Sequence, residues 1–227
     1  MRRRRGGALR GSARLSIVDL HAWPNPERRS RAVPKANGNP WTVLGSKPIY
    51  ENPWIRVVEH DVLNPRGKPG IYGVVGIKSI ATGVVPIHDD GHITLVGQYR
   101  FPLGIYSWEI PEGGGKADED PLVSIQRELV EETGLTARNW RHIQTMHLSN
   151  SITDEVAHLF LAWGLEQGTA MPEDTEELEI RRVPFTVAFE MAMRGDMTDA
   201  MTVAALLKTR HLAREGVLPP DVARLIL

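Results

Sequence analysis

The chain contains no cysteine, which removes several classes of chemistry at once. Without thiols there is no disulfide, cysteine nucleophile or thiolate metal site, and we expect a protein of the reducing cytoplasm. No apolar run approaches the ~18 to 20 residues that a membrane-spanning helix needs, so we expect no membrane span. We assign no metal site to the eight histidines. A P-loop and a dinucleotide-binding GxGxxG motif are also missing.

The net charge of −1 hides a strong asymmetry between the two parts of the chain. Residues 1–36 contain nine arginines and Lys35 against only Asp19 and Glu27, so this segment carries +8 and the remainder −9. Such a segment is typical of a nucleic-acid or membrane-surface arm, or of a targeting peptide. Because residues 1–40 are proline-rich and lack hydrophobic periodicity, we expect a disordered basic extension instead.

The most informative stretch is residues 113–135, GGGKADEDPLVSIQRELVEETGL. Glu128, Glu131 and Glu132 have the spacing i, i+3, i+4, which at ~100° per residue places them within about a third of a helix circumference. Carboxylates crowded on one helix face repel one another, and a bound cation would relieve that repulsion. An oxygen-rich group of this kind suits a hard divalent ion such as Mg²⁺ or Mn²⁺.

The boundaries of a helix around these carboxylates are also marked. Asp120 is a favourable N-cap, Pro121 suits the first helical position, and Gly134 is a typical C-terminal stop. An apolar face follows from the helical spacing of Leu122, Ile125 and Leu129, and it places Glu132 close to the core. The glycine run 113–115 allows the backbone to approach a ligand or metal closely.

This stretch resembles the Nudix hydrolase signature. That pattern is Gly, five residues, Glu, seven residues, Arg-Glu, an aliphatic residue, any residue, Glu-Glu, any residue, Gly and an aliphatic residue. All defined positions and both gaps match, at Gly113, Glu119, Arg127, Glu128, Leu129, Glu131, Glu132, Gly134 and Leu135. A glutamate-rich solvated helix is the alternative, and it does not explain the complete pattern.

Strand and helix signals surround the signature. Strands are expected at residues 54–63, 71–77, 82–87, 92–99, 139–146, 156–163 and 178–185, and "YSWEIPEGGG" is expected to run as one short strand into the signature. Asp90-Gly91 is a strong hairpin signal. The strand "VAHLFLAW" is apolar enough to be central in a sheet. Helices are expected at residues 186–194, 200–214 and 219–227.

The flanking stretches resemble the ADP-ribose pyrophosphatase-like branch of the Nudix family. They are "YENPWIRVVEHDV" with "NPRG", "VGQYRFPLGIYSWEIPEGG", "TDEVAHLFLA" and "EELEIRRVPF". The resemblance implies an α/β/α sandwich with a mixed sheet and an added small antiparallel sheet. It also implies a homodimer in which strands are exchanged between subunits. We therefore expect a basic extension at 1–40, an N-terminal β subdomain for dimerisation at 41–80, and a Nudix domain with C-terminal helices at 81–227.

The resemblance implies metal-dependent hydrolysis of the diphosphate in a nucleoside diphosphate sugar. ADP-ribose is the first expectation, giving AMP and ribose 5-phosphate, with two or three Mg²⁺ or Mn²⁺ ions clamping the phosphates. The implied metal ligands are Glu128, Glu131 and Glu132, together with the backbone carbonyl of Glu112 and the additional carboxylate of Glu119.

The resemblance also implies roles around the metal ions. Arg127 is expected to orient carboxylates, because a guanidinium fork matches their geometry. The base is expected on the acidic loop "PEDTEELE", with Glu176 and Glu177 as candidates, although that loop also fits a merely solubilising role. Substrate contacts are expected from Arg100, Glu109, Gly113 and Gly114, with a structural salt bridge as the alternative for Arg100.

One departure from the branch concerns specificity. ADP-ribose-specific members usually have a proline about fifteen residues after the signature, whereas this chain has "HLSNSITDE" there. Other nucleotide sugars, including GDP-mannose and UDP-glucose, therefore remain alternatives. A non-catalytic nucleotide-sugar sensor and a nucleic-acid-binding protein are the alternatives from other classes, but a sensor does not need every catalytic carboxylate, and a nucleic-acid partner is not expected.

Overall fold

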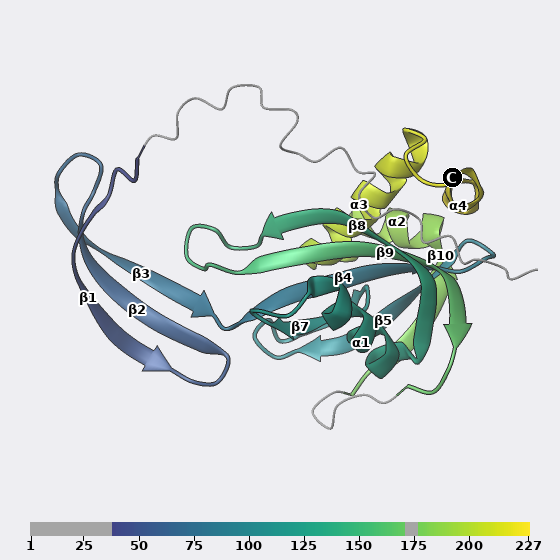
Figure 1. Cartoon of the computed structure of the whole chain (residues 1–227), viewed down its shortest axis with the longest axis horizontal. Coiled ribbons are helices and arrows are strands. Elements are labelled where there is room, and N and C mark those ends of the chain that lie inside the picture. Colours follow the sequence, from purple (N-terminus) through teal and green to yellow (C-terminus); the bar gives the residue numbers. More distant parts are fainter. Residues whose placement is uncertain (1–37, 171–176) are drawn as a thin grey trace, which may run out of the picture. The chain divides into compact units, whose positions relative to one another are not determined.

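The computed structural model describes residues 38–170 and 177–227 (Figure 1). Residues 1–37 of the expected basic extension lie outside the described part of the chain. Among the described helices, none is long and apolar enough to cross a membrane.

The first three strands form an antiparallel sheet in the order β1-β2-β3, from Thr42–Glu51 (β1), Ile55–Leu63 (β2) and Pro69–Ile77 (β3). Asn64 closes the turn between the second and third strands, because its side-chain oxygen accepts hydrogen bonds from the backbone N–H groups of Arg66 and Lys68. The sheet has little core of its own, since Val62 is the one buried apolar side chain on its three strands.

The larger sheet contains seven strands and is mixed, as expected. Five follow the order β10-β5-β4-β9-β8: Glu179–Pro184 (β10), His92–Arg100 (β5), Ser79–Ile87 (β4), Val156–Gln167 (β9) and Leu135–His147 (β8). The β4 and β9 strands pair in parallel, and the other neighbours are antiparallel. Because β9 lies between β4 and β8, the prediction of a central strand there is confirmed.

Helices cover both faces of this sheet (Figure 1). On β4, Val84 packs with Ile125 and Leu129 of helix α1 (Pro121–Thr133), while its neighbour Val85 belongs to the opposite core. Successive side chains of a strand point to opposite faces, so one strand supplies both cores. The second core is completed by helices α2 (Phe185–Arg194), α3 (Ala200–Arg214) and α4 (Pro220–Ile226). The expected α/β/α sandwich is confirmed.

The strand expected to run through "YSWEIPEGGG" is in fact two strands, so this prediction was wrong. Ile105–Glu109 (β6) pairs with β5, whereas Glu112–Lys116 (β7) pairs with β4. The break falls at Ile110 and Pro111: proline lacks the N–H that would continue a ladder, and the N–H of Ile110 donates to Thr202 Oγ1 on α3 at 3.0 Å. The glycine run is therefore a strand of the sheet.

We predict that Gly91→Ala destabilises the domain much more than Gly195→Ala. Both glycines have φ near +80°, where an L side chain costs roughly 1–2 kcal/mol. A Cβ on Gly91 would also lie 2.2 Å from the carbonyl oxygen of Leu225 in α4, whereas a Cβ on Gly195 meets nothing within 4 Å. Urea unfolding should show the larger loss for Gly91→Ala, by at least about 1 kcal/mol. Equal losses would contradict the close α4 contact.

Candidate functional site

The ends of helix α1 are fixed by the residues expected to cap it. Asp120 accepts a hydrogen bond from the N–H of Leu122 at 2.9 Å, and Pro121 occupies the first turn. At the other end Gly134 adopts φ 70°, and its N–H donates to the carbonyl of Val130. These predictions are confirmed, and they place the three signature glutamates in the second half of the helix.

The three signature glutamates differ in burial. Glu132 is 2% exposed, and the side chains of Glu128 and Glu131 are 13% and 27% exposed. Glu132 Oε2 accepts a hydrogen bond from the N–H of Glu112 at 3.2 Å, which ties the helix to the start of β7. A buried carboxylate needs such partners because burial disfavours its charge.

Arg127 connects the carboxylates to the glycine strand. Its guanidinium lies 2.8 Å from Glu128 and 2.7 Å from Glu131, and it donates to the carbonyl of Gly114 at 3.1 Å. Burial opposes the charge of Arg127, but the two glutamates outweigh it and raise its pKa. The geometry is therefore that of the expected orienting residue, and the catalytic consequence stays a prediction.

Two glycines of β7 permit the close approach of α1. A Cβ on Gly113 would lie 2.3 Å from Glu128 Cδ, and one on Gly115 would lie 2.6 Å from Ser124 Oγ. A Cβ on Gly114, which faces the other way, would have nothing nearer than 3.8 Å. Glu119 also lies beside this strand, where Oε2 accepts from the N–H of Lys116 at 3.3 Å.

The side chain of Glu112 points to the opposite face of β7, where it meets Arg100. Arg100 donates from Nε to both oxygens of Glu109 at 3.0 Å, and from Nη2 to Glu112 Oε1 at 2.8 Å. Burial lowers the pKa of Arg100, but the two glutamates outweigh it, and the net direction is upward. Two of the four residues expected to contact substrate, Arg100 and Glu109, thus form an ion pair with each other, and contact with substrate stays a prediction.

Glu109, Glu112 and Asp199 form a second acidic group, and sequence reasoning did not identify Asp199 as a site residue. Asp199 caps α3 by accepting from the N–H of Thr202 at 2.6 Å. One carboxylate oxygen from each of Glu109, Glu112 and Asp199 lies within 4.8 Å of the other two. Burial, followed by Asp199 and Glu109, raises the pKa of Glu112 well above its ordinary value. Burial would also raise the pKa of Glu109, but the hydrogen bonds from Arg100 hold it low.

The structure describes only one of the two residues that we expect as the catalytic base. Glu176 lies outside the described residues. Glu177 is described and exposed, two residues before β10, and neighbouring Glu179 accepts a hydrogen bond from the Tyr106 hydroxyl at 3.2 Å. The assignment of the base therefore stays a prediction.

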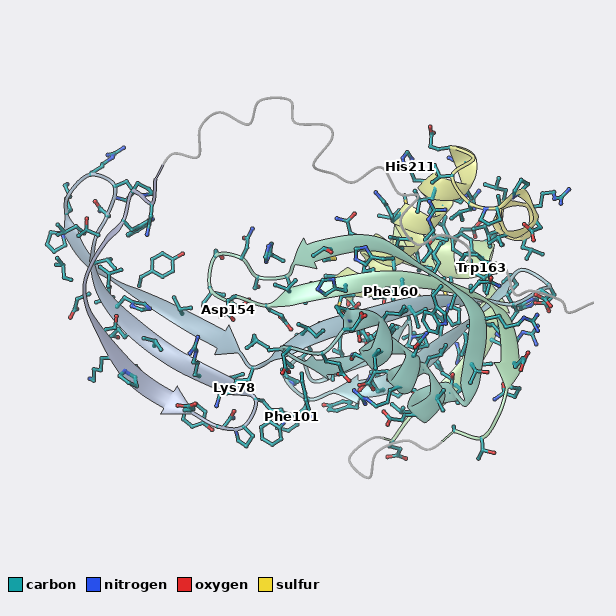
Figure 2. The ribbon with its side chains drawn as sticks, in the orientation of Figure 1. Lys78, Phe101, Asp154, Phe160, Trp163 and His211 are labelled. Carbon is teal, nitrogen blue, oxygen red and sulfur yellow. The ribbon has the colours of Figure 1, made fainter. Side chains whose placement is uncertain are left out.

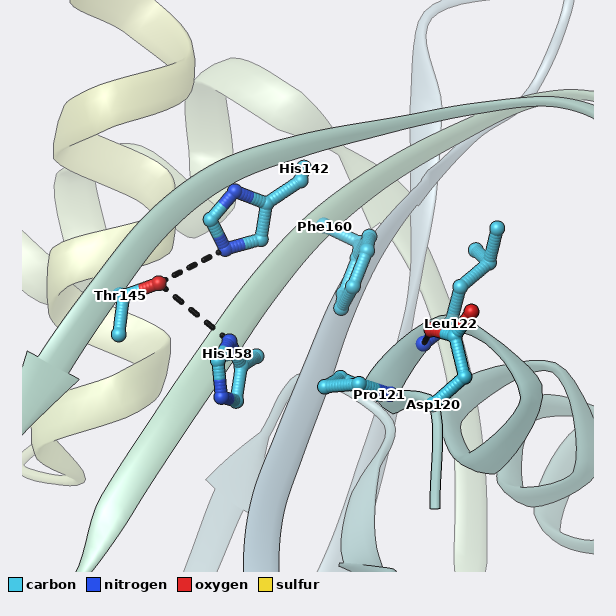
Figure 3. A pocket seen from close by; sticks show the side chains of 7 residues that line it. All are labelled: Asp120, Pro121, Leu122, His142, Thr145, His158 and Phe160. Carbon is cyan, nitrogen blue, oxygen red and sulfur yellow. Dashed lines mark hydrogen bonds between the residues drawn. The ribbon is translucent and has the colours of Figure 1, made fainter. Parts of the chain in front are cut away.

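A separate hollow of about 300 Å³ lies at the N-terminal end of α1 (Figure 3). Thr145 Oγ1 sits between His142 Nε2 at 3.1 Å and His158 Nδ1 at 3.3 Å. Burial lowers the pKa of both imidazoles, which favours two neutral rings bridged by one hydroxyl. None of the expected metal ligands lines this hollow, whose remaining lining residues are Asp120, Pro121, Leu122 and Phe160.

Comparison with known proteins agrees with the signature. Residues 78–204 match the NUDIX domain model, and residues 41–75 match the nucleoside diphosphate sugar hydrolase N-terminal domain model. An ADP-ribose pyrophosphatase of Bacillus subtilis is 32% identical over 72% of this chain and 89% of its own length. A GDP-mannose pyrophosphatase of Salmonella typhimurium is 33% identical over 53% of this chain and 68% of its own length.

A third relative has a different substrate in its name. The CMP-5'-(N-acetyl-N-hydroxy-3-aminopropyl)phosphonate hydrolase of Streptomyces rubellomurinus is 29% identical over 74% of this chain and 81% of its own length. Among solved structures, an ADP compounds hydrolase superposes with a TM-score of 0.70 at 22% identity, over 78% of this chain and 97% of that one, which shows a shared fold. Because the NUDIX match covers more than half of the chain and the signature is complete, the chain belongs to the Nudix hydrolase family, in its ADP-ribose pyrophosphatase-like branch.

Proposed function

We propose that this enzyme hydrolyses the diphosphate bond of a nucleoside diphosphate sugar, with ADP-ribose as the first substrate and AMP and ribose 5-phosphate as the products. The observation that carries the proposal is that the complete signature lies on one helix against β7: Glu128 packs on Gly113, and the buried Glu132 accepts from the N–H of Glu112. The names of the relatives support the substrate class, since two of them are an ADP-ribose and a GDP-mannose pyrophosphatase. The cytoplasmic location that we expect for a cysteine-free chain is part of this proposal.

The donor set fits a hard divalent cation. Glu128, Glu131 and Glu132 offer carboxylate oxygens from one helix, and the Glu112 backbone, whose N–H donates to Glu132, would add its carbonyl oxygen. Oxygen donors of this kind are those that Mg²⁺ and Mn²⁺ accept. When bound, two or three such ions would neutralise the diphosphate and supply an activated water. Glu119, beside Lys116, is the proposed ligand for an additional ion.

The protein's own residues would position these groups. Arg127 holds Glu128 and Glu131 while donating to Gly114, so it fixes the carboxylates relative to the glycine backbone along which the phosphates would lie. Glu177, or Glu176 next to it, would accept the proton of the attacking water. Glu177 is exposed and lies two residues before β10, which would leave it free to reach a bound substrate.

A homodimer is part of the proposal. Large apolar side chains are exposed on β1 and around the β5–β6 turn, which is unusual for a surface that stays in water. Phe101, which Figure 2 labels, is 88% exposed. The others are Val43, Leu44, Ile49, Tyr50, Tyr99, Leu103, Ile105 and Tyr106.

We predict that Glu132→Gln abolishes most turnover without unfolding the protein. The amide keeps an oxygen that can accept from the N–H of Glu112 but loses the charge that holds a cation. Loss of a metal's outer-shell partner typically costs about 10–100-fold, so loss of a ligand should cost at least about 100-fold. Glu190→Gln, an exposed change on α2, is the matched control.

The measurement is the release of phosphorylated products from ADP-ribose, GDP-mannose, UDP-glucose, dinucleotides and nucleoside triphosphates, with Mg²⁺, with Mn²⁺ and with chelator. The proposal expects metal-dependent cleavage of a nucleotide sugar, fastest with ADP-ribose. Wild-type turnover by Glu132→Gln would disprove the metal assignment. Absence of cleavage by a folded wild-type protein that binds metal would favour the sensor alternative.

Replacing the glycines of β7 tests the close approach independently of substrate. We predict that Gly113→Ala weakens Mn²⁺ binding at least about tenfold, because its Cβ must displace the Glu128 carboxylate. Gly114→Ala introduces the same methyl group on the open face and should bind Mn²⁺ nearly as wild type does. Calorimetric titration with Mn²⁺ measures both variants. Equal affinities would show that Glu128 is not a ligand.

Sedimentation tests the dimer. A dimer of 25.3 kDa chains is expected for the wild type, and Phe101→Asp should weaken it at least about tenfold, since a charge buried in an apolar interface is costly. Met193→Asp, at an exposed apolar position on α2, adds the same charge elsewhere and should leave the dimer intact. A monomeric wild type would contradict this part of the proposal.

A further inference from the structure

Glu109, Glu112 and Asp199 form a second carboxylate group, on the face of β7 opposite α1. They come from the end of β6, the start of β7 and the N-cap of α3, so the fold brings together residues far apart in sequence. One oxygen from each lies within 4.8 Å of the other two. The alternation along β7 separates this group from Glu128, because Gly113 faces α1 whereas Glu112 faces Arg100.

A buried oxygen of Glu112 points to a ligand in this group. The Glu112 side chain is only 8% exposed. Its Oε1 accepts from Arg100 at 2.8 Å, whereas Oε2 is fully buried and no N–H or O–H group in the described part of the chain donates to it. The neighbouring Glu109 carboxyl can hydrogen-bond to Glu112 only when one of the two carries a proton, so a proton or a cation must lie between these carboxylates. Buried polar atoms are nearly always satisfied, and an unsatisfied carboxylate oxygen is among the costliest exceptions.

The charges around this oxygen are unbalanced. When ionised, the three carboxylates carry −3, and Arg100 is the one cation hydrogen-bonded to them among the described residues. The remaining −2 is the charge that one divalent ion neutralises. Each carboxylate also keeps free lone pairs, since a carboxylate offers about four acceptor sites. Glu109 uses some of its sites for Arg100, and Asp199 uses one for the N–H of Thr202.

We propose that Glu109, Glu112 and Asp199 bind a divalent cation of their own, separate from the ions of the signature helix. Oxygen ligands lie about 2.0–2.6 Å from Mg²⁺ or Ca²⁺, so two ligands of one ion are at most ~5 Å apart, in accord with the spacing here. All donors are carboxylates, which selects a hard cation such as Mg²⁺ or Mn²⁺.

Such an ion would also support the signature site. Glu112 belongs to both groups: its side chain lies in the second group, and its N–H donates to Glu132. Asp199 begins α3, so the ion would fasten this helix to the start of β7. The role is to position the backbone beside the signature glutamates, and it does not depend on which substrate the enzyme hydrolyses.

The test counts bound Mn²⁺ by electron paramagnetic resonance titration of the full-length protein without substrate. Asp199→Asn is the main variant, because asparagine remains a good N-cap while the charge is lost. It should bind one Mn²⁺ fewer than the wild type, or bind that ion at least tenfold more weakly. Asp196→Asn is the matched control, since Asp196 lies just before α3 and pairs with Arg194 instead.

Combination with Glu132→Gln separates the two sites. Glu132→Gln should keep the ion that Asp199→Asn loses, and the double variant should lose the ions of both sites. Because the readout is bound Mn²⁺, it detects this site even if the enzyme hydrolyses no nucleotide sugar. Glu112→Gln provides a second measurement, because it removes one of the three neighbouring carboxylate charges. The melting temperature of this variant without metal should be higher than that of the wild type, and Mn²⁺ should raise it by less. An unchanged Mn²⁺ titration for both Asp199→Asn and Glu112→Gln would overturn the proposal. Loss of the same ion by Asp199→Asn and Glu132→Gln would overturn it as well.

Discussion

The site depends on the close approach of helix α1 to strand β7. Carboxylates can be held beside a backbone only where no side chain stands between them, and Gly113 provides that space, since a Cβ there would overlap Glu128. The approach is then fastened from two directions. Glu132 accepts from the N–H of Glu112, and Arg127 reaches the carbonyl of Gly114. The helix could not move away without breaking both contacts, so the carboxylates are positioned before any cation arrives.

Pro111 determines what lies on the other face of β7. By ending the ladder it splits the segment into β6 and β7, and these pair with different strands of the sheet. The N–H of Ile110 is satisfied by Thr202, so the start of α3 lies at the break. Because Pro111 breaks the strand and Thr202 binds the N–H of Ile110 at the break, Asp199 at the start of α3 lies near Glu109 and Glu112. The two carboxylate groups lie back to back on one short strand, with Glu112 contacting both.

Local signals were sufficient for much of the fold. The caps of α1, the helix at 200–214 and the interior position of the apolar strand "VAHLFLAW" depend on neighbouring residues and on periodicity, and all were predicted. The clustering of Asp199 with Glu109 was not predicted, because it arises from tertiary packing across ninety residues. The ion pair of Arg100 was foreseen only as an alternative, since a lone strand-end arginine fits a phosphate or a carboxylate equally well.

Substrate choice has a different physical origin from the chemistry. The signature fixes carboxylates and backbone, which any nucleoside diphosphate sugar could use, whereas the segment in place of the missing proline is a turn closed by the Ile152 N–H on the Ser149 carbonyl. That turn is held by the first sheet: the carbonyl of Ile152 accepts from Val75, and the Tyr72 hydroxyl donates to Ser151. A hydrogen-bonded turn can replace the rigidity of a proline, so the absence of the proline alone does not exclude ADP-ribose as the substrate. The first sheet therefore fixes the position of the segment in which this chain departs from the ADP-ribose-specific pattern.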